Sequence, residues 1–343
     1  MAAPPPLRVG VLGVGVMGQH HARLYAALPQ AELVGLYDVD PLRAGEIASR
    51  YHTRAFDSLD ALLDANLDAV TIAVPTGLHH AIALECFARG LHCLVEKPLA
   101  STAPECQELT ARAAQAGRLV MVGHIERFNP AVQALKDIIE FGTLGEIRGL
   151  STLRVGPRPP RITDAGIMLD VGCHDIDLLT WLTGHRATEV RATAVGPDPG
   201  RGAIAATIQL EFGLLQPGVA EMNWQYNYKN RRLTVQWEHC TALLDFMRQQ
   251  LIISNTIGAT TVPVSKAEPL RRELEAFLVA IQEGETSPVP GEDSHYTVQV
   301  IDAAQESAGD PAHPWIALPP LAPAIESPVI TGYPAMEFEP ALV

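Results

Sequence analysis

Three glycines near the start of the chain restrict its fold more than any other feature. Gly13, Gly15 and Gly18 form the pattern Gly-x-Gly-x-x-Gly between an apolar stretch from Leu7 and a helical stretch that runs to about Leu28. The first glycine permits a tight turn, the second lets a diphosphate approach the backbone, and the third allows close helix–strand packing. A turn that serves packing alone is the alternative. The pattern predicts a strand–turn–helix unit in which these residues bind a dinucleotide: Gly13, Gly15, Val16, Met17 and Gly18.

An acidic residue further on predicts which dinucleotide binds. A second strand is expected from Glu32 to Tyr37, and Asp38 follows it, about 20 positions after Gly18. A carboxylate there accepts hydrogen bonds from both hydroxyls of the adenosine ribose and repels a 2′-phosphate. The sequence therefore favours NAD over NADP, although the nearby Arg43 leaves NADP open.

Helical and strand patterns alternate as far as residue 123. The expected elements are Pro41 to Tyr51, a short helix capped by Ser58, a strand from Ala69 to Val74, a helix closed by Gly90, a helix capped by Thr102, and a strand from Arg118 to Gly123. Continuous apolar strands separated by helices are typical of parallel sheets covered on both faces. Residues 1–124 are predicted to form an α/β Rossmann domain with a doubly wound parallel sheet.

The pattern changes in the second part of the chain. Short strands separated by turn residues are expected at Gly145–Val155, Ala187–Val195, Ala203–Phe212, Gly218–Trp224, Arg232–Trp237, Thr241–Phe246 and Leu251–Ser254. They predict an α+β domain with an open-faced, mainly antiparallel sheet over residues 125–309. Two late helices, Glu268–Glu283 and Ser294–Ala308, are expected to close the fold and can pack back on the first domain. Residues 310–343 carry eight prolines and are predicted to be an extended arm or a loose end.

A lysine follows one of the parallel strands, at the edge where ligands bind in sheets of this kind. Lys97 precedes Pro98, and we expect a cis bond between them that aims the lysine into the cleft. A surface lysine in an ordinary turn is the alternative. Further residues expected at this edge, on the cofactor side, are Pro75, Thr76, His79 and Glu96.

A second group of polar residues lies on a helix predicted from Ile167 to Thr183. Asp170, His174 and Asp177 are four and three residues apart, so they share one face of an α-helix. A carboxylate one turn from a histidine orients the imidazole and makes it more basic, as a general base requires. A solvated polar face is the alternative reading.

Basic residues precede this helix. Arg154, Arg158 and Arg161 fall within eight positions, which suits an anionic ligand such as a phosphate group. Solvated loop arginines explain the same pattern. Lys229, Arg231 and Arg232 form a weaker second group, which we interpret as sheet-edge charges.

Composition excludes several classes of protein. A chain of 343 residues with a formal net charge of -14 is a poor partner for nucleic acid, because phosphate backbones are held by basic surfaces. No run reaches the roughly 18 apolar residues of a membrane span, and no signal peptide is evident, so we expect a cytoplasmic protein. Five cysteines without Cys-x-x-Cys spacing indicate neither a disulfide framework nor a metal site.

Taken together, these marks resemble the Gfo/Idh/MocA oxidoreductase family over nearly the whole chain. The matching residues are Gly13-x-Gly15-x-x-Gly18, Pro75-Thr76-x-x-His79, Glu96-Lys97-Pro98 and Asp170-x-x-x-His174. The resemblance implies a Rossmann domain followed by an open-faced sheet domain, with Lys97, Asp170 and His174 as the catalytic residues.

Within the family, residues 123–130, Gly-Pro-Arg-Pro-Pro-Arg at 156–161 and His174-Asp175-Ile176-Asp177 are most similar to members that oxidise the 3-hydroxyl of UDP-N-acetylglucosamine. This similarity adds Arg127 and Asn129 to the candidate substrate-binding residues. A dehydrogenase of a free sugar or a polyol such as inositol, and a regulator that senses the dinucleotide without catalysis, are the alternatives. Lys97, rather than His174, is an alternative base.

The second sheet also predicts self-association. Gln236-Trp237, Leu243-Leu244 and Leu251-Ile252-Ile253 carry more apolar surface than a monomer normally exposes. We expect sheet-to-sheet contact in a homodimer or homotetramer.

Overall fold

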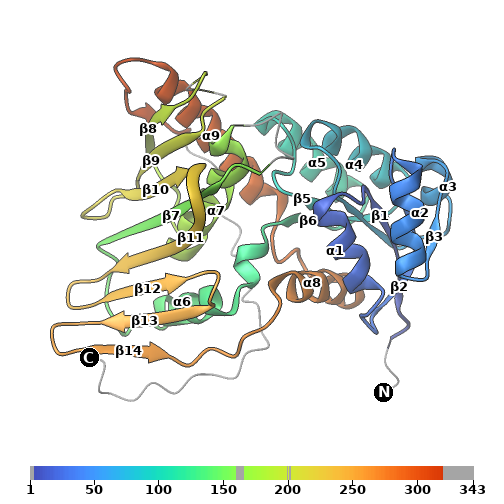
Figure 1. Ribbon diagram of the computed structural model, residues 1–343, viewed down its shortest axis with the longest axis horizontal. Coiled ribbons are helices and arrows are strands. Elements are labelled where there is room, and N and C mark those ends of the chain that lie inside the picture. Colours follow the sequence, from blue (N-terminus) through green and yellow to red (C-terminus); the bar gives the residue numbers. More distant parts are fainter. Residues whose placement is uncertain (1–3, 160–165, 199, 201, 320–343) are drawn as a thin grey trace. The chain divides into compact units, whose positions relative to one another are not determined.

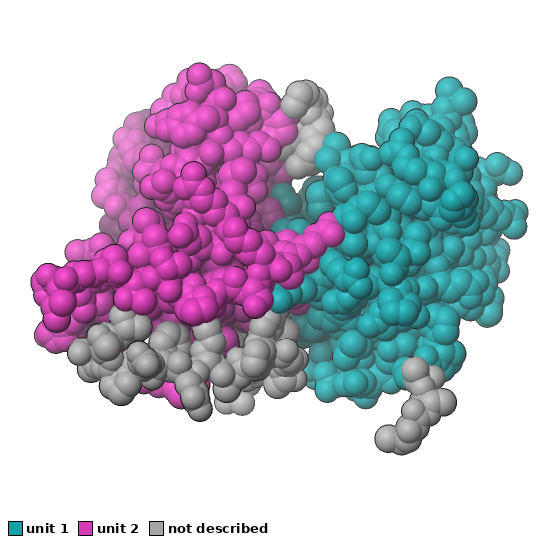
Figure 2. Space-filling model, turned by 60° about the horizontal axis from the view of Figure 1, so that its bottom comes forward, with its two compact units in different colours: residues 1–125, 270–296, 324–330 teal, residues 126–269, 297–323, 331–343 magenta. Residues whose placement is uncertain are grey.

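The computed structural model describes residues 4–159, 166–198, 200 and 202–319. Arg161 and most of the proline-rich tail lie outside these residues. The described chain forms two compact units, which Figure 2 colours separately. Unit 1 holds the residues up to Ile125 together with Leu270–Tyr296, and unit 2 holds Glu126–Pro269 together with the residues from Thr297 onward.

Unit 1 contains a parallel sheet of six strands in the order β3-β2-β1-β4-β5-β6 (Figure 1). The strands are β1 (Leu7–Leu12), β2 (Ala31–Tyr37), β3 (Arg54–Ala55), β4 (Ala69–Ile72), β5 (His92–Glu96) and β6 (Val120–Gly123). The chain turns back at β1, so the carboxyl ends of β1 and β4 flank the point where strand order reverses, the usual ligand position in such sheets. The predicted doubly wound parallel sheet is confirmed.

The helices of this unit begin and end close to the predicted positions. They are α1 (Val16–Tyr25), α2 (Pro41–Arg50), α3 (Leu59–Leu63), α4 (His79–Ala88), α5 (Ala103–Gln115) and α8 (Pro269–Glu283), with a 3₁₀ turn η1 (Thr76–Leu78). Ser58 caps α3, and Thr102 and Glu105 form a capping box on α5. α8 comes from the far end of the sequence, and the segment after it accepts a hydrogen bond from the sheet, since the N–H of Val122 on β6 donates to the carbonyl oxygen of Val289 at 3.0 Å.

Unit 2 contains nine strands in the order β14-β13-β12-β11-β7-β10-β9-β8-β15. They are β7 (Gly149–Pro157), β8 (Glu189–Val195), β9 (Ala205–Glu211), β10 (Gly218–Asn223), β11 (Gln225–Gln236), β12 (Thr241–Asp245), β13 (Gln250–Ser254), β14 (Ala259–Val262) and β15 (Ile316–Ala317). Neighbouring strands are antiparallel except β7 and β10. The predicted mainly antiparallel sheet is therefore confirmed.

Three parts of this sheet differ from the sequence-based expectation. β11 begins at Gln225 rather than Arg232, and β14 was not expected. β15 lies in the region interpreted as an arm or a loose end, where Ile316 pairs with Val190 of β8. These segments carry few apolar residues in alternation, so the pattern gave little signal.

Helices pack on one face of the sheet. α6 (Pro130–Phe141) contacts β12 and β13, while α7 (Cys173–Thr183) contacts β7 and β10 (Figure 1). Strand alternation directs Leu233, Val235 and Leu244 to the covered face, where all three are fully buried. α9 (Gly291–Gly309) contributes residues to both units. Among the described helices, none combines the length and hydrophobicity needed to cross a membrane.

The turn between β1 and α1 shows why its glycines are not equivalent. Gly13 has φ +79°, in the left-handed region that favours glycine. At Gly18 a Cβ would overlap the carbonyl oxygen of Gly13, which places α1 directly against the turn. At Gly15, which precedes the first turn of α1 with φ -66°, a Cβ would meet nothing within 4 Å.

We therefore expect opposite effects from two conservative substitutions. Gly18→Ala should lower the melting temperature by about 4–10 °C, because overpacking against backbone costs roughly 1–3 kcal/mol. Gly15→Ala should melt like the wild type and lose dinucleotide binding, because its methyl group occupies the space over the turn. Thermal melting and NAD titration of both variants measure the two effects. Equal melting temperatures for both variants, or undiminished NAD binding by Gly15→Ala, would contradict this account.

Candidate active site

One group of predicted site residues lies at the carboxyl edge of the parallel sheet in unit 1. Val16 and Met17 open α1, and Val16 is half-exposed, so the first N–H groups of the helix face away from the packed core. A helix N-terminus carries partial positive charge, which suits a diphosphate. With the open space over Gly15, the turn fits the pyrophosphate of a dinucleotide.

Asp38 is held where the ribose of such a ligand would lie. Its Oδ2 accepts the N–H of Val14 at 2.8 Å, and its Oδ1 accepts the N–H of Asp40 at 2.9 Å. A carboxylate accepts about four hydrogen bonds, so capacity remains for two hydroxyls. Arg43 Nη1 lies 3.6 Å from Asp38 Oδ2, and the same side chain also pairs with Asp40.

His79 joins two segments of this edge. It is buried, with Nε2 at 2.9 Å from the carbonyl oxygen of Val74 and Nδ1 at 2.9 Å from that of Pro98. Burial lowers the pKa of His79, although both carbonyl groups act in the opposite direction. A neutral ring donates to only one carbonyl, and the contacts indicate that His79 positions the residues around Lys97. Contact with the cofactor stays a prediction. Pro75 and Thr76 lie in the turn just before it.

Lys97 stands at the end of β5, half-buried, and its bond to Pro98 is cis as expected. The preceding Glu96 is buried, and its Oε1 lies 3.0 Å from Nε2 of His21 on α1. Burial raises the pKa of Glu96, but the hydrogen bond from His21 and the charges of His21 and Lys97 outweigh it and lower the pKa. Glu96 is therefore an anion held within the unit.

The sequence did not single out Glu273, which faces this anion. Both of its carboxyl oxygens are buried, and neither has a hydrogen-bond partner within the described residues. Burial and the charge of Glu96 raise the pKa of Glu273 well above its usual value. The sequence does contain a sign that Glu273 is buried, because this residue interrupts the apolar stripe of Leu270, Leu274 and Phe277 on α8.

Another group of predicted site residues lies on the predicted catalytic helix of unit 2. The helix starts with a π-turn, η3 (Met168–Gly172), continues as α7, and ends at Gly184 with φ 66°. Asp170 lies in the π-turn, whose wider winding keeps residues four apart nearly aligned. Asp170 and His174 are both half-buried, whereas Asp177 is fully buried. The expected polar face is therefore divided, with its first two members near the surface and Asp177 inside.

A buried ion-pair network fixes the helix to the sheet. Arg154 on β7 donates from Nε to Asp175 Oδ1 at 2.6 Å and from Nη1 to Glu126 Oε1 at 2.9 Å. Its guanidinium carbon lies 4.5 Å from the ring centroid of Phe246. Burial alone would lower the pKa of Arg154, but the two carboxylates raise it, so the group stays charged. Removing one partner of such a buried pair typically costs about 3–5 kcal/mol.

A second buried pair acts on the same helix. Arg127 donates from Nε to Asp177 Oδ2 at 2.9 Å and from Nη2 to Oδ1 at 2.6 Å, and it is 2% exposed. Asn129 caps α6 through Ala131 N–H and donates to the carbonyl oxygen of Phe246 at 3.1 Å. Arg127, Asn129 and Arg154 are thus engaged inside unit 2. Their predicted contact with substrate stays a prediction, and the geometry favours a positioning role.

Arg158 differs from these residues. It is exposed at the end of β7, and its guanidinium carbon lies 5.5 Å from the ring centroid of Trp224. Lys97 belongs to unit 1, while Asp170, His174 and Arg158 belong to unit 2.

Within the described residues, no group of three or more His, Cys, Asp or Glu side chains is arranged to hold a metal ion.

Comparison with known proteins agrees with both halves of this arrangement. Residues 7–124 match the oxidoreductase family with an NAD-binding Rossmann fold known as GFO_IDH_MocA, and residues 132–242 match the C-terminal domain of GFO/IDH/MocA proteins. The chain is 36% identical over 287 residues to a UDP-N-acetylglucosamine 3-dehydrogenase of Acidithiobacillus ferrooxidans, covering 80% of this chain and 88% of that one.

Two further comparisons extend the match. An inositol 2-dehydrogenase of Acidothermus cellulolyticus is 30% identical over 326 residues, covering 90% of this chain and 94% of that one. The solved structure of the Acidithiobacillus ferrooxidans UDP-N-acetylglucosamine 3-dehydrogenase superposes with a TM-score of 0.79 at 33% identity, covering 88% of this chain and 98% of that one. The chain therefore belongs to the Gfo/Idh/MocA oxidoreductase family and is an NAD(P)-dependent dehydrogenase of that family.

Proposed function

We propose that the protein oxidises a hydroxyl group of a UDP-linked sugar to a ketone, most specifically the 3-hydroxyl of UDP-N-acetylglucosamine. The observation that carries the proposal is the helix of unit 2, which keeps Asp170 and His174 near the surface while two buried ion pairs hold it in place. The 36% identical relative supports the choice of a UDP-sugar, and exposed Arg158 supports an anionic substrate.

In the proposed reaction, His174 accepts the proton of the sugar hydroxyl. Asp170 orients the imidazole and favours its charged form. Lys97 donates a hydrogen bond to the same oxygen and stabilises its developing negative charge. The alternative assignment, with Lys97 as the base, uses the same residues. The proposal includes the statement that residues of both units act in the same reaction.

We propose NAD as the cofactor, which when bound supplies the acceptor for the hydride. The fixed carboxylate of Asp38 is matched to two ribose hydroxyls and is repelled by a 2′-phosphate. Arg43 does not reverse this choice, because its charge is shared between Asp38 and Asp40.

A substrate panel tests the function and the cofactor together. The pure protein is incubated with UDP-N-acetylglucosamine, other UDP-sugars, free N-acetylglucosamine and inositol, each with NAD and with NADP, and reduced nicotinamide is followed by absorbance. We expect the highest kcat/KM for UDP-N-acetylglucosamine with NAD. A preference for inositol would favour the free-polyol alternative, which the 30% identical relatives support. Cofactor binding without turnover of any substrate would favour the non-catalytic sensor.

We also propose that the protein self-associates through the uncovered face of the second sheet. Leu243 is 37% exposed there, and its neighbour Ile252 on β13 is half-buried. Alternation turns Leu244, Leu251 and Ile253 to the covered side, so the apolar surface is smaller than the sequence suggested. It is still continuous across β12 and β13.

This surface predicts a homodimer or homotetramer at micromolar concentration. Light scattering of the wild type measures the mass in solution. Leu243→Glu should shift the population towards monomer, because each interface would bury an unpaired charge. The matched change Leu42→Glu, at an exposed apolar position on α2 and therefore outside this sheet, should leave the mass unchanged. A monomeric wild type would contradict the proposal.

A further inference from the structure

Two basic segments that are far apart in sequence meet in the second sheet. Arg158 directly follows β7, whereas Lys229 and Arg231 lie on β11. β11 pairs antiparallel with β7, so Gln225 lies opposite Pro157 and Arg231 lies opposite Arg154. The sequence-based interpretation treated the two groups separately and considered the second to be sheet-edge charge. That interpretation is wrong, because β11 lies inside the sheet between β12 and β7. Its pairing with β7 places both groups near the carboxyl end of β7.

The strand carrying the second group is bulged at this point. The register shifts between Gln225 and Asn230, so that Gly156 alone faces the intervening residues of β11. Lys229 passes close to this glycine, since its Cγ lies 3.3 Å from the position of a Cβ on Gly156. Bulges of this kind redirect side chains and occur often beside active sites.

The cationic side chains of this region differ in how far they are buried. Arg154 is held by ion pairs with two carboxylates, those of Glu126 and Asp175, and 3% of its side chain is exposed. Arg231, its neighbour across the strands, is 44% exposed, and its Nη1 lies 4.0 Å from Glu126 Oε1. Lys229 is exposed, and within the described part of the chain it makes no ion pair. Arg231 and Lys229 are thus able to meet a ligand without breaking the buried network.

The position of Arg231 also connects it with the proposed chemistry. Arg231 lies on the helix-covered face of β11, as do Leu233 and Val235, but beyond the part that the helices bury. It is within electrostatic reach of Asp170, Glu126 and Asp175. Arg158, Lys229 and Arg231 are thus three exposed cations on or directly after paired strands of an otherwise acidic protein, and we call them the rim.

We propose that Lys229 and Arg231, together with Arg158, hold the diphosphate of a nucleotide-linked substrate. This inference rests on the proposed function, which it deepens by naming the residues that recognise the anionic part. Arg231 supplies a planar donor fork, Lys229 supplies a compact charge, and Trp224 supports the guanidinium of Arg158. These groups raise affinity for the nucleotide and take no part in proton transfer.

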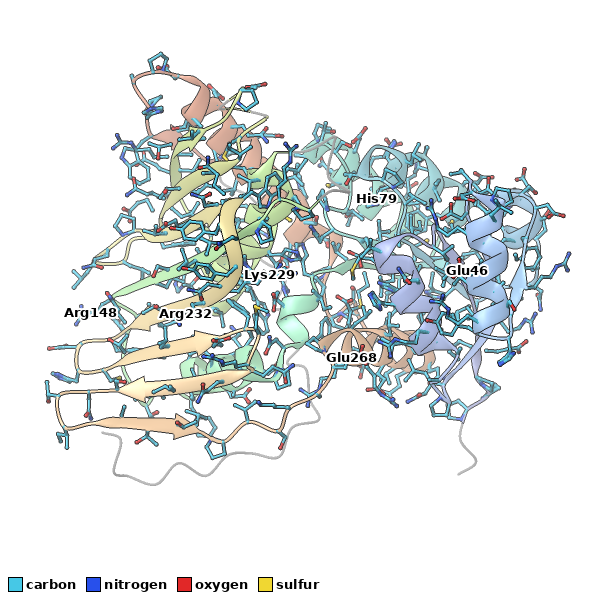
Figure 3. All side chains as sticks on the ribbon, in the orientation of Figure 1. Glu46, His79, Arg148, Lys229, Arg232 and Glu268 are labelled. Carbon is cyan, nitrogen blue, oxygen red and sulfur yellow. The ribbon has the colours of Figure 1, made fainter. Side chains whose placement is uncertain are left out.

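The test compares charge-removing substitutions on one strand. Arg231→Gln and Lys229→Gln are matched with Arg232→Gln, because Arg232 is adjacent on β11 and exposed but alternates to the opposite face. Figure 3 labels Lys229 and Arg232 on the ribbon. UDP binding is measured by calorimetry, and thermal melting checks that each variant folds. We expect Kd for UDP to rise about tenfold or more for Arg231→Gln and Lys229→Gln, and by less than twofold for Arg232→Gln. Arg231→Lys should restore part of the loss.

The steady-state kinetics separate this inference from the proposed function. With UDP-N-acetylglucosamine, the two rim variants should raise KM and leave kcat near its wild-type value. If the wild type oxidises this sugar but all three Gln variants bind UDP alike, the rim assignment is wrong and the function stands. If the rim variants lose UDP binding but the wild type oxidises no UDP-sugar, the proposed function is wrong and the assignment of the rim residues to diphosphate binding is kept. Failure of the wild type to bind UDP would overturn both.

Discussion

The buried charge of Arg154 is the interaction on which the second half of the molecule depends. One guanidinium contacts two carboxylates from different segments, Asp175 on α7 and Glu126 just before α6. A charge in the protein interior is tolerated only when it is paired in this way, so the three segments have little freedom to separate. The adjacent pair of Arg127 and Asp177 acts on the same helix. Together they fix the helix that presents His174.

This arrangement explains why arginines so close in sequence differ in exposure. Arg154 and Arg158 lie on and just after the same strand, but the helix covers the first and leaves the second exposed. Arg231, paired with Arg154 across two strands, lies where the cover ends. Residue type and spacing predicted an anionic ligand. We propose that the exposed Arg158 and Arg231 contact such a ligand, whereas Arg154 is buried.

Much of the fold follows from local sequence signals. The glycine turn, the capping residues Ser58 and Thr102, and the continuous apolar strands specify the six-stranded sheet, because each acts over a few residues. The antiparallel strands were also predicted, apart from short edge strands such as β14 and β15. The features that the sequence left open depend on contacts between distant segments. Examples are the pairing of β7 with β11, the packing of α8 in unit 1 and the raised pKa of the buried Glu273. No pattern within one segment specifies such contacts.

We propose that His174 and Lys97 act directly on the reacting hydroxyl group. Turnover of His174→Ala and Lys97→Ala with saturating substrate, beside NAD binding measured on the same preparations, tests it most directly. We predict that each variant binds NAD as the wild type does and loses kcat by about a hundredfold or more, since proton transfer and charge stabilisation both act on the barrier. Near-normal turnover by either variant would contradict the role assigned to that residue.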